Sequence, residues 1–152
     1  MTASANPIAT EALPWIPLRD GVSMRPLHFE DDGYALHLKV GPGAVITRHR
    51  HTGAAHALNL SGRREIVDTG EVVGPGDYVF EAAGNQDSWR CYGDAPCVVH
   101  ITLTGRVEYL GAHGEVESYS DSATARRHYL DWCAAAGQAP DAKVIGAPAR
   151  HG

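Results

Sequence analysis

The chain has 152 residues, a formal net charge of −5 and three cysteines. This length fits one domain with a hydrophobic core of its own. The acidic balance, without a block of Lys or Arg, argues against a nucleic-acid-binding surface. An odd number of cysteines without close spacing argues against a disulfide framework and against a cysteine-based zinc site. No apolar run has membrane-spanning length and no secretory pattern opens the chain, so we expect a cytoplasmic protein without membrane or nucleic-acid partners.

Most of the chain is predicted to form short strands. Residues 1–12 are small and polar and are expected to form a flexible N-terminal arm. The apolar stretch from Leu13 to Leu18 contains two prolines, which favour an extended segment over an edge or over the core. Alternating or β-branched runs then predict strands over residues 21–29, 34–40, 45–51, 56–60, 63–67, 71–73, 78–81, 87–92, 97–103 and 106–110. Many short strands with Gly- and Pro-rich turns predict an all-β fold, an antiparallel barrel or sandwich.

The C-terminal part of the chain departs from this pattern. Ala, Leu, Trp and Arg recur at helical intervals over about 122–136, after a polar pair and before Gly137. A polar cap and a terminal glycine are typical of helix ends. We therefore expect a single domain over residues 13–137 that ends in an α-helix, followed by a flexible tail over residues 138–152.

Three histidines cluster in the middle of the chain. His49 and His51 are two residues apart on a predicted strand, so their side chains should project to the same face. His56 follows after a short turn. Neutral imidazole is a common ligand of transition metals, and this stretch therefore predicts half of a metal site. The alternative interpretation is a pair of surface histidines on a basic segment.

Four arginines flank these histidines and the next strand. Arg48 and Arg50 alternate with His49 and His51, so they are expected on the opposite, solvated face. The same outer position is expected for Arg63 and Arg64.

Two motifs resemble those of the cupin superfamily. The first cupin motif has a glycine, five further residues, His-x-His, an acidic ligand and a second glycine. The positions that match it, with histidine in the acidic place, are Gly43, His49, His51, His56 and Gly62. The resemblance implies a single-domain cupin fold, a small β-barrel of the double-stranded β-helix, jelly-roll type, here with a C-terminal α-helix.

The second cupin motif is Pro-Gly-Asp, a small-x-Gly turn and a histidine. Residues 75–77 and 82–84 match it, and Asp87 stands where the family has histidine. The chain also resembles, more narrowly, the 2,4'-dihydroxyacetophenone dioxygenase group of cupins, and more distantly the acetylacetone-cleaving dioxygenase. This likeness rests on His-x-His-Thr-Gly, Val-Phe-Glu-x-x-Gly, a late Tyr-Leu strand and the C-terminal helix. It implies Fe(II) held by three histidines, and cleavage of a C–C bond beside a carbonyl with O₂.

The expected metal ligands are His49, His51 and His56, with Asp87 either as a fourth ligand or as a residue behind the ligands. His49 and His51 with the carboxylate of Asp87 also suit non-haem Fe(II), so this set of three ligands stays open. The expected metal is Fe(II), and Zn, Ni or Mn are the other candidates.

Three further residues are candidates for catalysis. Glu81 and Asp68 are the candidate bases, although Glu81 also fits a structural hydrogen bond and Asp68 a turn. His100 lies mid-strand in an apolar run, as a buried hydrogen-bonded histidine or as a pocket residue. The residues expected to line the pocket are Leu58, Val79, Trp89 and Tyr109.

The leading hypothesis is a metal-dependent dioxygenase that cleaves a C–C bond next to a carbonyl in a small aromatic hydroxy-ketone or dicarbonyl compound. One alternative is a redox-neutral cupin, such as an isomerase, cyclase or lyase, that uses the metal as a Lewis acid. Another is a non-catalytic cupin that binds a small molecule. A homodimer is expected, because an N-terminal arm can cover an exposed sheet edge of a partner.

Overall fold

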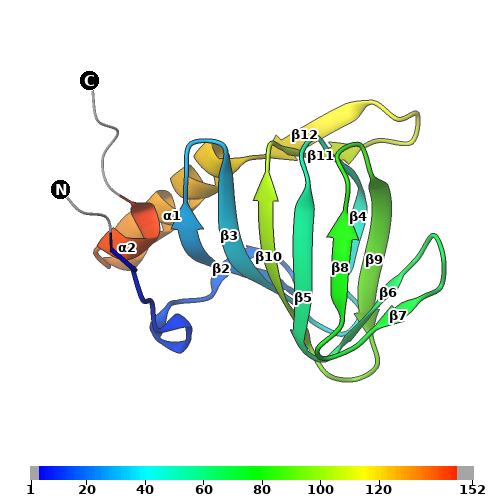
Figure 1. Ribbon diagram of the computed structural model, residues 1–152, viewed down its shortest axis with the longest axis horizontal. Coiled ribbons are helices and arrows are strands. Elements are labelled where there is room, and N and C mark those ends of the chain that lie inside the picture. Colours follow the sequence, from blue (N-terminus) through cyan, green and yellow to red (C-terminus); the bar gives the residue numbers. More distant parts are fainter. Residues whose placement is uncertain (1–3, 147–152) are drawn as a thin grey trace.

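Two antiparallel sheets face each other and enclose the core, with the C-terminal helix at one end (Figure 1). The computed structural model describes residues 4–146. In chain order the elements are η1 (Thr10–Ala12), β1 (Ile16–Arg19), β2 (Val22–Phe29), β3 (Gly33–Val40), β4 (Val45–His51), β5 (Ala55–Ser61), β6 (Arg63–Ile66), β7 (Val72–Val73), β8 (Tyr78–Glu81), β9 (Gln86–Tyr92), β10 (Cys97–Thr104), β11 (Val107–Leu110), β12 (Val116–Ser120), α1 (Ser122–Ala136) and α2 (Ala142–Ile145).

The first sheet has the strand order β1-β2-β3-β10-β5-β8, and the second has the order β12-β11-β4-β9-β6-β7. Neighbouring strands pair in antiparallel fashion throughout both sheets. The order is not sequential, because between β3 and β11 the chain passes repeatedly from one sheet to the other. This arrangement confirms the predicted all-β, antiparallel fold.

The core between the sheets consists of two clusters of buried side chains. The cluster nearer α1 contains, among others, Met24, Phe29, Leu36, Leu103 and Tyr129. The other contains Val22, Val40, Ile46, Ala57, Trp89, Cys91, Cys97 and Val99. Leu38 and Ile101 pack against both clusters and join them. Full burial of one such aliphatic side chain stabilises the fold by about 1.5–3 kcal/mol.

The helix α1 has the bounds that the sequence predicts. Asp121 accepts a hydrogen bond from the Thr124 amide, and the Thr124 side chain accepts one from the Asp121 amide, which forms a capping box. Gly137 ends the helix in the left-handed conformation. Ala125 and Tyr129 are buried one turn apart, so this face of α1 packs on the barrel.

The strand β12 is a difference from the sequence-based expectation, which ended the strands at residue 110. β12 pairs with β11 across the turn at residues 111–114. Four of its five residues are exposed, and only Ser120 is partly buried. A strand without a buried face lacks the alternation of apolar and polar residues on which the prediction depends.

Parts of both terminal segments lie against the barrel. Within the tail expected to be flexible, residues 142–145 form α2, and Val144 is fully buried next to β2. The Lys143 ammonium donates a hydrogen bond to the Pro7 carbonyl at 2.8 Å, so α2 also contacts the N-terminal arm. Residues 1–3 of the expected arm and residues 147–152 of the expected tail lie outside the described residues.

The extended segment predicted after the arm is the edge strand β1, which pairs with β2 of the same chain. The expected homodimer stays a prediction. None of the described helices is long and apolar enough to cross a lipid bilayer.

Gly62→Ala is expected to destabilise the protein more than Gly70→Ala. Both glycines have positive φ angles, 66° and 75°, which cost an L-residue about 1–2 kcal/mol. At Gly62 an added Cβ would also lie 2.1 Å from the Pro96 carbonyl oxygen, whereas at Gly70 it would meet open space. In urea unfolding we expect Gly70→Ala to lose about 1 kcal/mol and Gly62→Ala at least about twice as much. Equal losses would contradict the close approach of residues 62 and 96.

Candidate metal centre

Strand β4 presents His49 and His51 to the barrel interior. If the strand were regular, the inward positions after Ile46 would be Arg48 and Arg50. The pairing of β4 with β9 shifts by one residue between Ile46 and His49. This β-bulge reverses the alternation, so Ile46 and both histidines are buried while the arginines point away.

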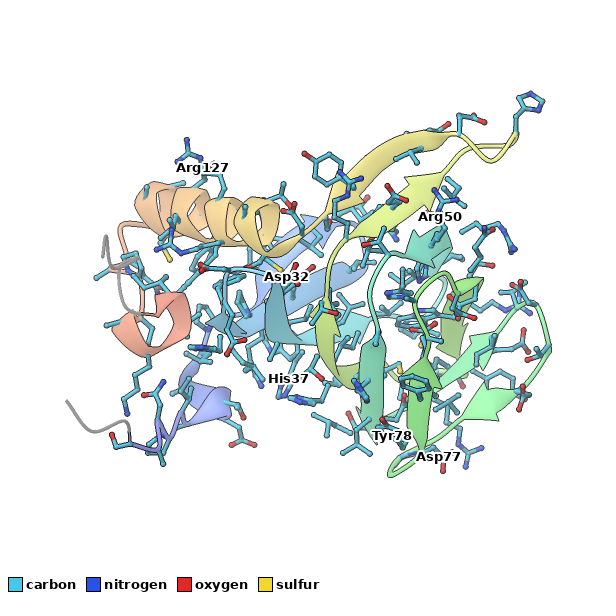
Figure 2. The ribbon with its side chains drawn as sticks, turned by 45° about the horizontal axis from the view of Figure 1, so that its top comes forward. Asp32, His37, Arg50, Asp77, Tyr78 and Arg127 are labelled. Carbon is cyan, nitrogen blue, oxygen red and sulfur yellow. The ribbon has the colours of Figure 1, made fainter. Side chains whose placement is uncertain are left out.

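The two arginines of β4 form ion pairs away from the interior. Arg50 donates hydrogen bonds of 3.1 and 2.8 Å to Oε1 of Glu108, and Figure 2 labels its place on β4. Arg48 pairs with Oδ2 of Asp68 at 2.9 Å, and about half of the Arg48 side chain is exposed. Asp68 is therefore engaged at the surface, which does not fit its expected role as a catalytic base.

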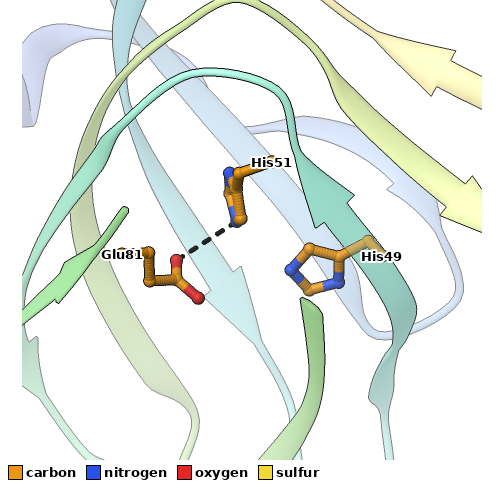
Figure 3. Close-up of side chains that lie close together, drawn as sticks. All are labelled: His49, His51 and Glu81. Atoms are coloured by element: carbon orange, nitrogen blue, oxygen red, sulfur yellow. Dashed lines mark ion pairs between the residues drawn. The ribbon is translucent and has the colours of Figure 1, made fainter. Parts of the chain in front are cut away.

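Glu81 completes a group of three candidate ligands with the histidines (Figure 3). The rings of His49 and His51 have centroids 5.1 Å apart and planes at 78°. Glu81 is the last residue of β8 in the opposite sheet, and its Oε2 lies 3.1 Å from Nε2 of His51. One ligand atom of each residue lies within 4.8 Å of the other two. Asn85 donates a hydrogen bond of 3.0 Å to Oε1 of Glu81 and so orients the carboxylate.

Asp87 brings a second carboxylate to His49. It faces His49 in the pairing of β9 with β4, and its Oδ1 lies 3.1 Å from Nε2 of His49. Burial raises the pKa of Asp87, but the contacts with His49 and Glu81 and the charges of both imidazoles outweigh burial and hold this pKa below its ordinary value. Asp87 is thus a charged neighbour of His49, next to the group of three.

The backbone sets the tautomer of His49. Nδ1 lies 2.7 Å from the Thr47 carbonyl oxygen, which only accepts hydrogen bonds, so Nδ1 carries the proton. Nε2 therefore faces Asp87. Burial lowers the pKa of His49, whereas Asp87, the Thr47 carbonyl and Glu81 raise it, and the result is a raised pKa. A positive charge at Nε2, whether a proton or a metal ion, is favoured by this environment.

The residues present fit a divalent metal ion. Among the described residues, both ring nitrogens of His51 and Oδ1 of Asp87 are buried without a hydrogen-bond partner. The contacts of 3.1 Å bring ring nitrogens and carboxylates together without the alignment of a hydrogen bond. Unpaired buried polar atoms are costly, and imidazole nitrogen and carboxylate oxygen are ordinary ligands of iron, zinc, nickel and manganese. An ion bound by His49, His51 and Glu81 would satisfy one of the two His51 nitrogens and would place positive charge near the Asp87 carboxylate.

His56 lies on the outer face of the first sheet. Its neighbours Ala55 and Ala57 face the interior, so the alternation of β5 turns His56 outward. Its Nδ1 contacts the hydroxyl of Tyr78, a residue labelled in Figure 2, and its ring centroid lies 5.2 Å from that of Phe80. The expectation that His56 is a metal ligand does not fit this placement. The match to the cupin motif placed His56 at the position of the acidic ligand in the sequence. It could not predict to which face of β5 the His56 side chain points.

His100 also lies on the outer face of that sheet. It pairs with His37 in the register of β10 and β3, and the two rings meet edge to face at 5.2 Å. Burial lowers the pKa of His100, and burial with the charges of His100 and Arg25 lowers the pKa of His37 to about 4. His100 therefore packs as a neutral ring outside the barrel interior, which fits the structural interpretation and not the catalytic one.

The candidate metal centre lies in the wall of a cavity of about 360 Å³ between the two sheets. The cavity runs between both core clusters, and most of its lining is apolar. Apart from the metal group, the lining includes Leu36, Leu38, Ile46, Trp89, Ile101 and Tyr109. Trp89 and Tyr109 are thus where the sequence places them, whereas Leu58 is partly exposed on the outer face. Burial raises the pKa of Tyr109, which keeps its hydroxyl protonated.

Arg64 also lines this cavity, which corrects its expected outer position. It is 4% exposed, whereas the preceding Arg63 is exposed. Side chains of successive strand residues point to opposite faces of the sheet. Where one face covers the core, two adjacent arginines therefore cannot both face solvent. That rule is the signal by which the sequence reveals one inward arginine at this site.

Solved structures share the fold of this chain. A protein of unknown function with a cupin-like fold from Ralstonia eutropha has a TM-score of 0.86 and 18% identity, with 100% of this chain and 99% of that chain covered. An acetylacetone dioxygenase from Acinetobacter johnsonii has a TM-score of 0.73 and 16% identity, with 86% and 93% covered. A polyketide cyclase from Streptomyces resistomycificus has a TM-score of 0.60 and 17% identity, with 78% and 85% covered. None of the curated proteins compared matches the chain.

These likenesses confirm a cupin fold, and at such low identity they concern the fold alone. A family model described as the ChrR cupin-like domain matches residues 4–108, more than half of the chain. The matched residues include the whole candidate metal centre. The chain therefore belongs to the ChrR cupin-like domain family, within the cupin superfamily that its two motifs resemble.

Proposed function

We propose that this protein is a metal-dependent cupin dioxygenase that cleaves a C–C bond next to a carbonyl in a small aromatic hydroxy-ketone or dicarbonyl compound. The observation that carries the proposal is the convergence of His49, His51 and Glu81 on one point in the wall of an apolar cavity. Two histidines and one carboxylate on one face of an ion leave positions open, and this set suits non-haem Fe(II). Glu81, expected as a base, is here the third ligand in place of His56.

The residues around the ligands hold them in position. The Thr47 carbonyl orients His49, Asn85 orients Glu81, and Asp87 stabilises positive charge at His49. When bound, the metal would act as a Lewis acid and, as iron, as the partner of O₂. The mainly apolar lining lowers the local polarity, which strengthens the electrostatic interactions within the site.

A redox-neutral reaction is the second candidate function. Two carboxylates beside two histidines, Glu81 and Asp87 with His49 and His51, also suit zinc and other ions that only polarise a carbonyl. The fold shared with a polyketide cyclase is compatible with this chemistry. A binding protein without turnover is the third candidate.

His49→Ala, His51→Ala and Glu81→Gln are each expected to lose most of the bound metal, because each removes one of three ligands. The measurement is the metal content of freshly purified protein by mass spectrometry. His56→Ala, which removes a histidine from the outer face, is the control and should keep the wild-type content. Full metal content in Glu81→Gln, or loss in His56→Ala, would contradict this ligand set.

Asp87→Asn is expected to weaken metal binding without abolishing it. The amide keeps the shape of the side chain but removes the negative charge beside His49, and such outer partners of ligands are worth roughly 10–100-fold in affinity. Competition with a chelator measures the change. A loss as complete as that of His49→Ala would make Asp87 a direct ligand.

The Fe(II)-loaded protein is expected to consume O₂ in the presence of 2,4'-dihydroxyacetophenone or acetylacetone, as followed with an oxygen electrode. The zinc-loaded protein is the control and should consume none. Turnover that continues without air, or with zinc, would favour the redox-neutral reaction instead. Binding of a metabolite without product, surviving in His49→Ala, would favour the non-catalytic function.

A further inference from the structure

Arg64 places a positive charge inside the barrel. It lies on β6, is 4% exposed, and lines the same cavity as Glu81 and both candidate histidine ligands. The proposed metal centre does not use this charge, and the described core residues offer it the ring of Trp89 but no carboxylate within ion-pair distance. Its presence in a mainly apolar cavity therefore needs a separate explanation.

The guanidinium of Arg64 is held in one orientation. Its Nε donates a hydrogen bond of 3.2 Å to Oδ1 of Asn59, and its Cζ lies 4.8 Å from the ring centroid of Trp89. Asn59 is itself fixed, because its amide donates to the carbonyls of Gly62 at 3.2 Å and Val73 at 3.4 Å. A side chain fixed on two sides in this way is preorganised for a ligand.

The position of Arg64 relative to the metal group follows from the pairing of the strands. Arg64 faces Cys91 in the register of β6 with β9, and its guanidinium reaches the ring of Trp89. Trp89 is the next inward-facing residue after Asp87 on β9. The metal group thus lies beside Asp87 of β9. The Arg64 guanidinium, which comes from β6, lies beside Trp89, the next inward residue of β9.

Arg64 has no ionic partner within the described part of the chain. The arginines that form ion pairs there are Arg48, Arg50, Arg90, Arg106 and Arg127. Burial lowers the pKa of Arg64, and electrostatic interactions with Glu81, Cys97 and Asp87 oppose this effect without outweighing it. A buried charge without an ionic partner is costly, and a ligand of opposite charge would compensate it.

The charges around the cavity indicate the sign of that ligand. With a divalent metal bound, the carboxylates of Glu81 and Asp87 balance the charge of the ion. The charge of Arg64 then remains without a counter-ion. A ligand with one negative charge neutralises it, whereas a phosphate monoester, close to doubly charged at neutral pH, exceeds it. The planar guanidinium also matches the two oxygens of a carboxylate.

We propose that Arg64 binds the carboxylate of the substrate, and that the substrate is a small monocarboxylic acid whose carbonyl end lies at the metal centre. This inference rests on the proposed metal-dependent function and names its substrate class, an oxo acid. The cavity volume of about 360 Å³ lies in the range of small-molecule sites.

The test uses three probes that differ in one group: 4-acetylbenzoate, 4-acetylbenzamide and 4-acetylphenyl phosphate. Their binding to the full chain, metal-free and loaded with redox-inert zinc, is measured by isothermal titration calorimetry. We expect the zinc-loaded wild type to bind the carboxylate at least about ten-fold tighter than the amide, as a charge-assisted hydrogen bond requires, and tighter than the phosphate. Equal binding of carboxylate and amide, or no binding of the carboxylate at millimolar concentration, overturns the proposal. Tightest binding of the phosphate overturns it as well.

Two variants locate the effect. Arg64→Gln should lose the preference for the carboxylate, and Arg64→Lys should keep part of it, because the lysine retains the charge without the planar fork. Arg63→Gln removes the same charge from the neighbouring exposed position and should keep the full preference. If the preference for the carboxylate survives in Arg64→Gln, the assignment to Arg64 is overturned. If Arg64→Gln does not fold, loss of the preference in Arg63→Gln overturns the assignment instead.

The failure of this inference is distinguishable from failure of the proposed function. If the wild type binds metal and turns over neutral ketones without any preference for a carboxylate, only the inference about Arg64 fails. If it binds the carboxylate through Arg64 but holds no metal, the proposed function fails while the anion site remains.

Discussion

Strand β4 carries one extra residue relative to its neighbour β9, and the orientation of both candidate histidine ligands depends on it. Ile46 and His49 both face the interior although they are three residues apart, which the shift in pairing with β9 allows. The Thr47 carbonyl within the bulge then accepts a hydrogen bond from His49 and sets its tautomer. A bulge of this kind re-aims side chains next to a site without changing the sheet around it. In its absence the interior would receive Arg48 and Arg50.

The polar groups that the bulge brings inside are costly to bury, and the barrel compensates them only in part. His49 contacts Asp87 and His51 contacts Glu81, yet the geometry leaves ring nitrogens and a carboxylate oxygen without hydrogen bonds in the described residues. The residues Asn59, Asn85 and Thr47 are used to orient charged side chains rather than to neutralise them. Groups held in position but not neutralised are typical of sites whose charge is completed by an ion and a ligand.

The cupin fold by itself does not decide between oxidative, redox-neutral and binding functions, because one fold supports many chemistries. The differences between these functions depend on the ligand set and on the lining of the cavity. In this protein the set has two histidines and a carboxylate where the resemblance implies three histidines. The negative charge of Glu81 and Asp87 therefore distinguishes the candidate site, and Arg64 adds a positive charge to the same cavity.

Local regularities of the sequence were enough to identify the all-β fold, the helix α1 with its polar cap and glycine end, and the pairing of His49 with His51 on one face. These features follow from alternation, capping and turn chemistry, which act between residues close in the chain. The sequence did not predict the strand β12, because this strand has no buried face. Only the tertiary structure decided that Glu81 joins the histidines from the opposite sheet, that His56 and His100 face outward, and that Arg64 faces inward. The physical reason is that the face of a strand depends on its register with its neighbours, and register is set by bulges and pairings between segments far apart in the chain.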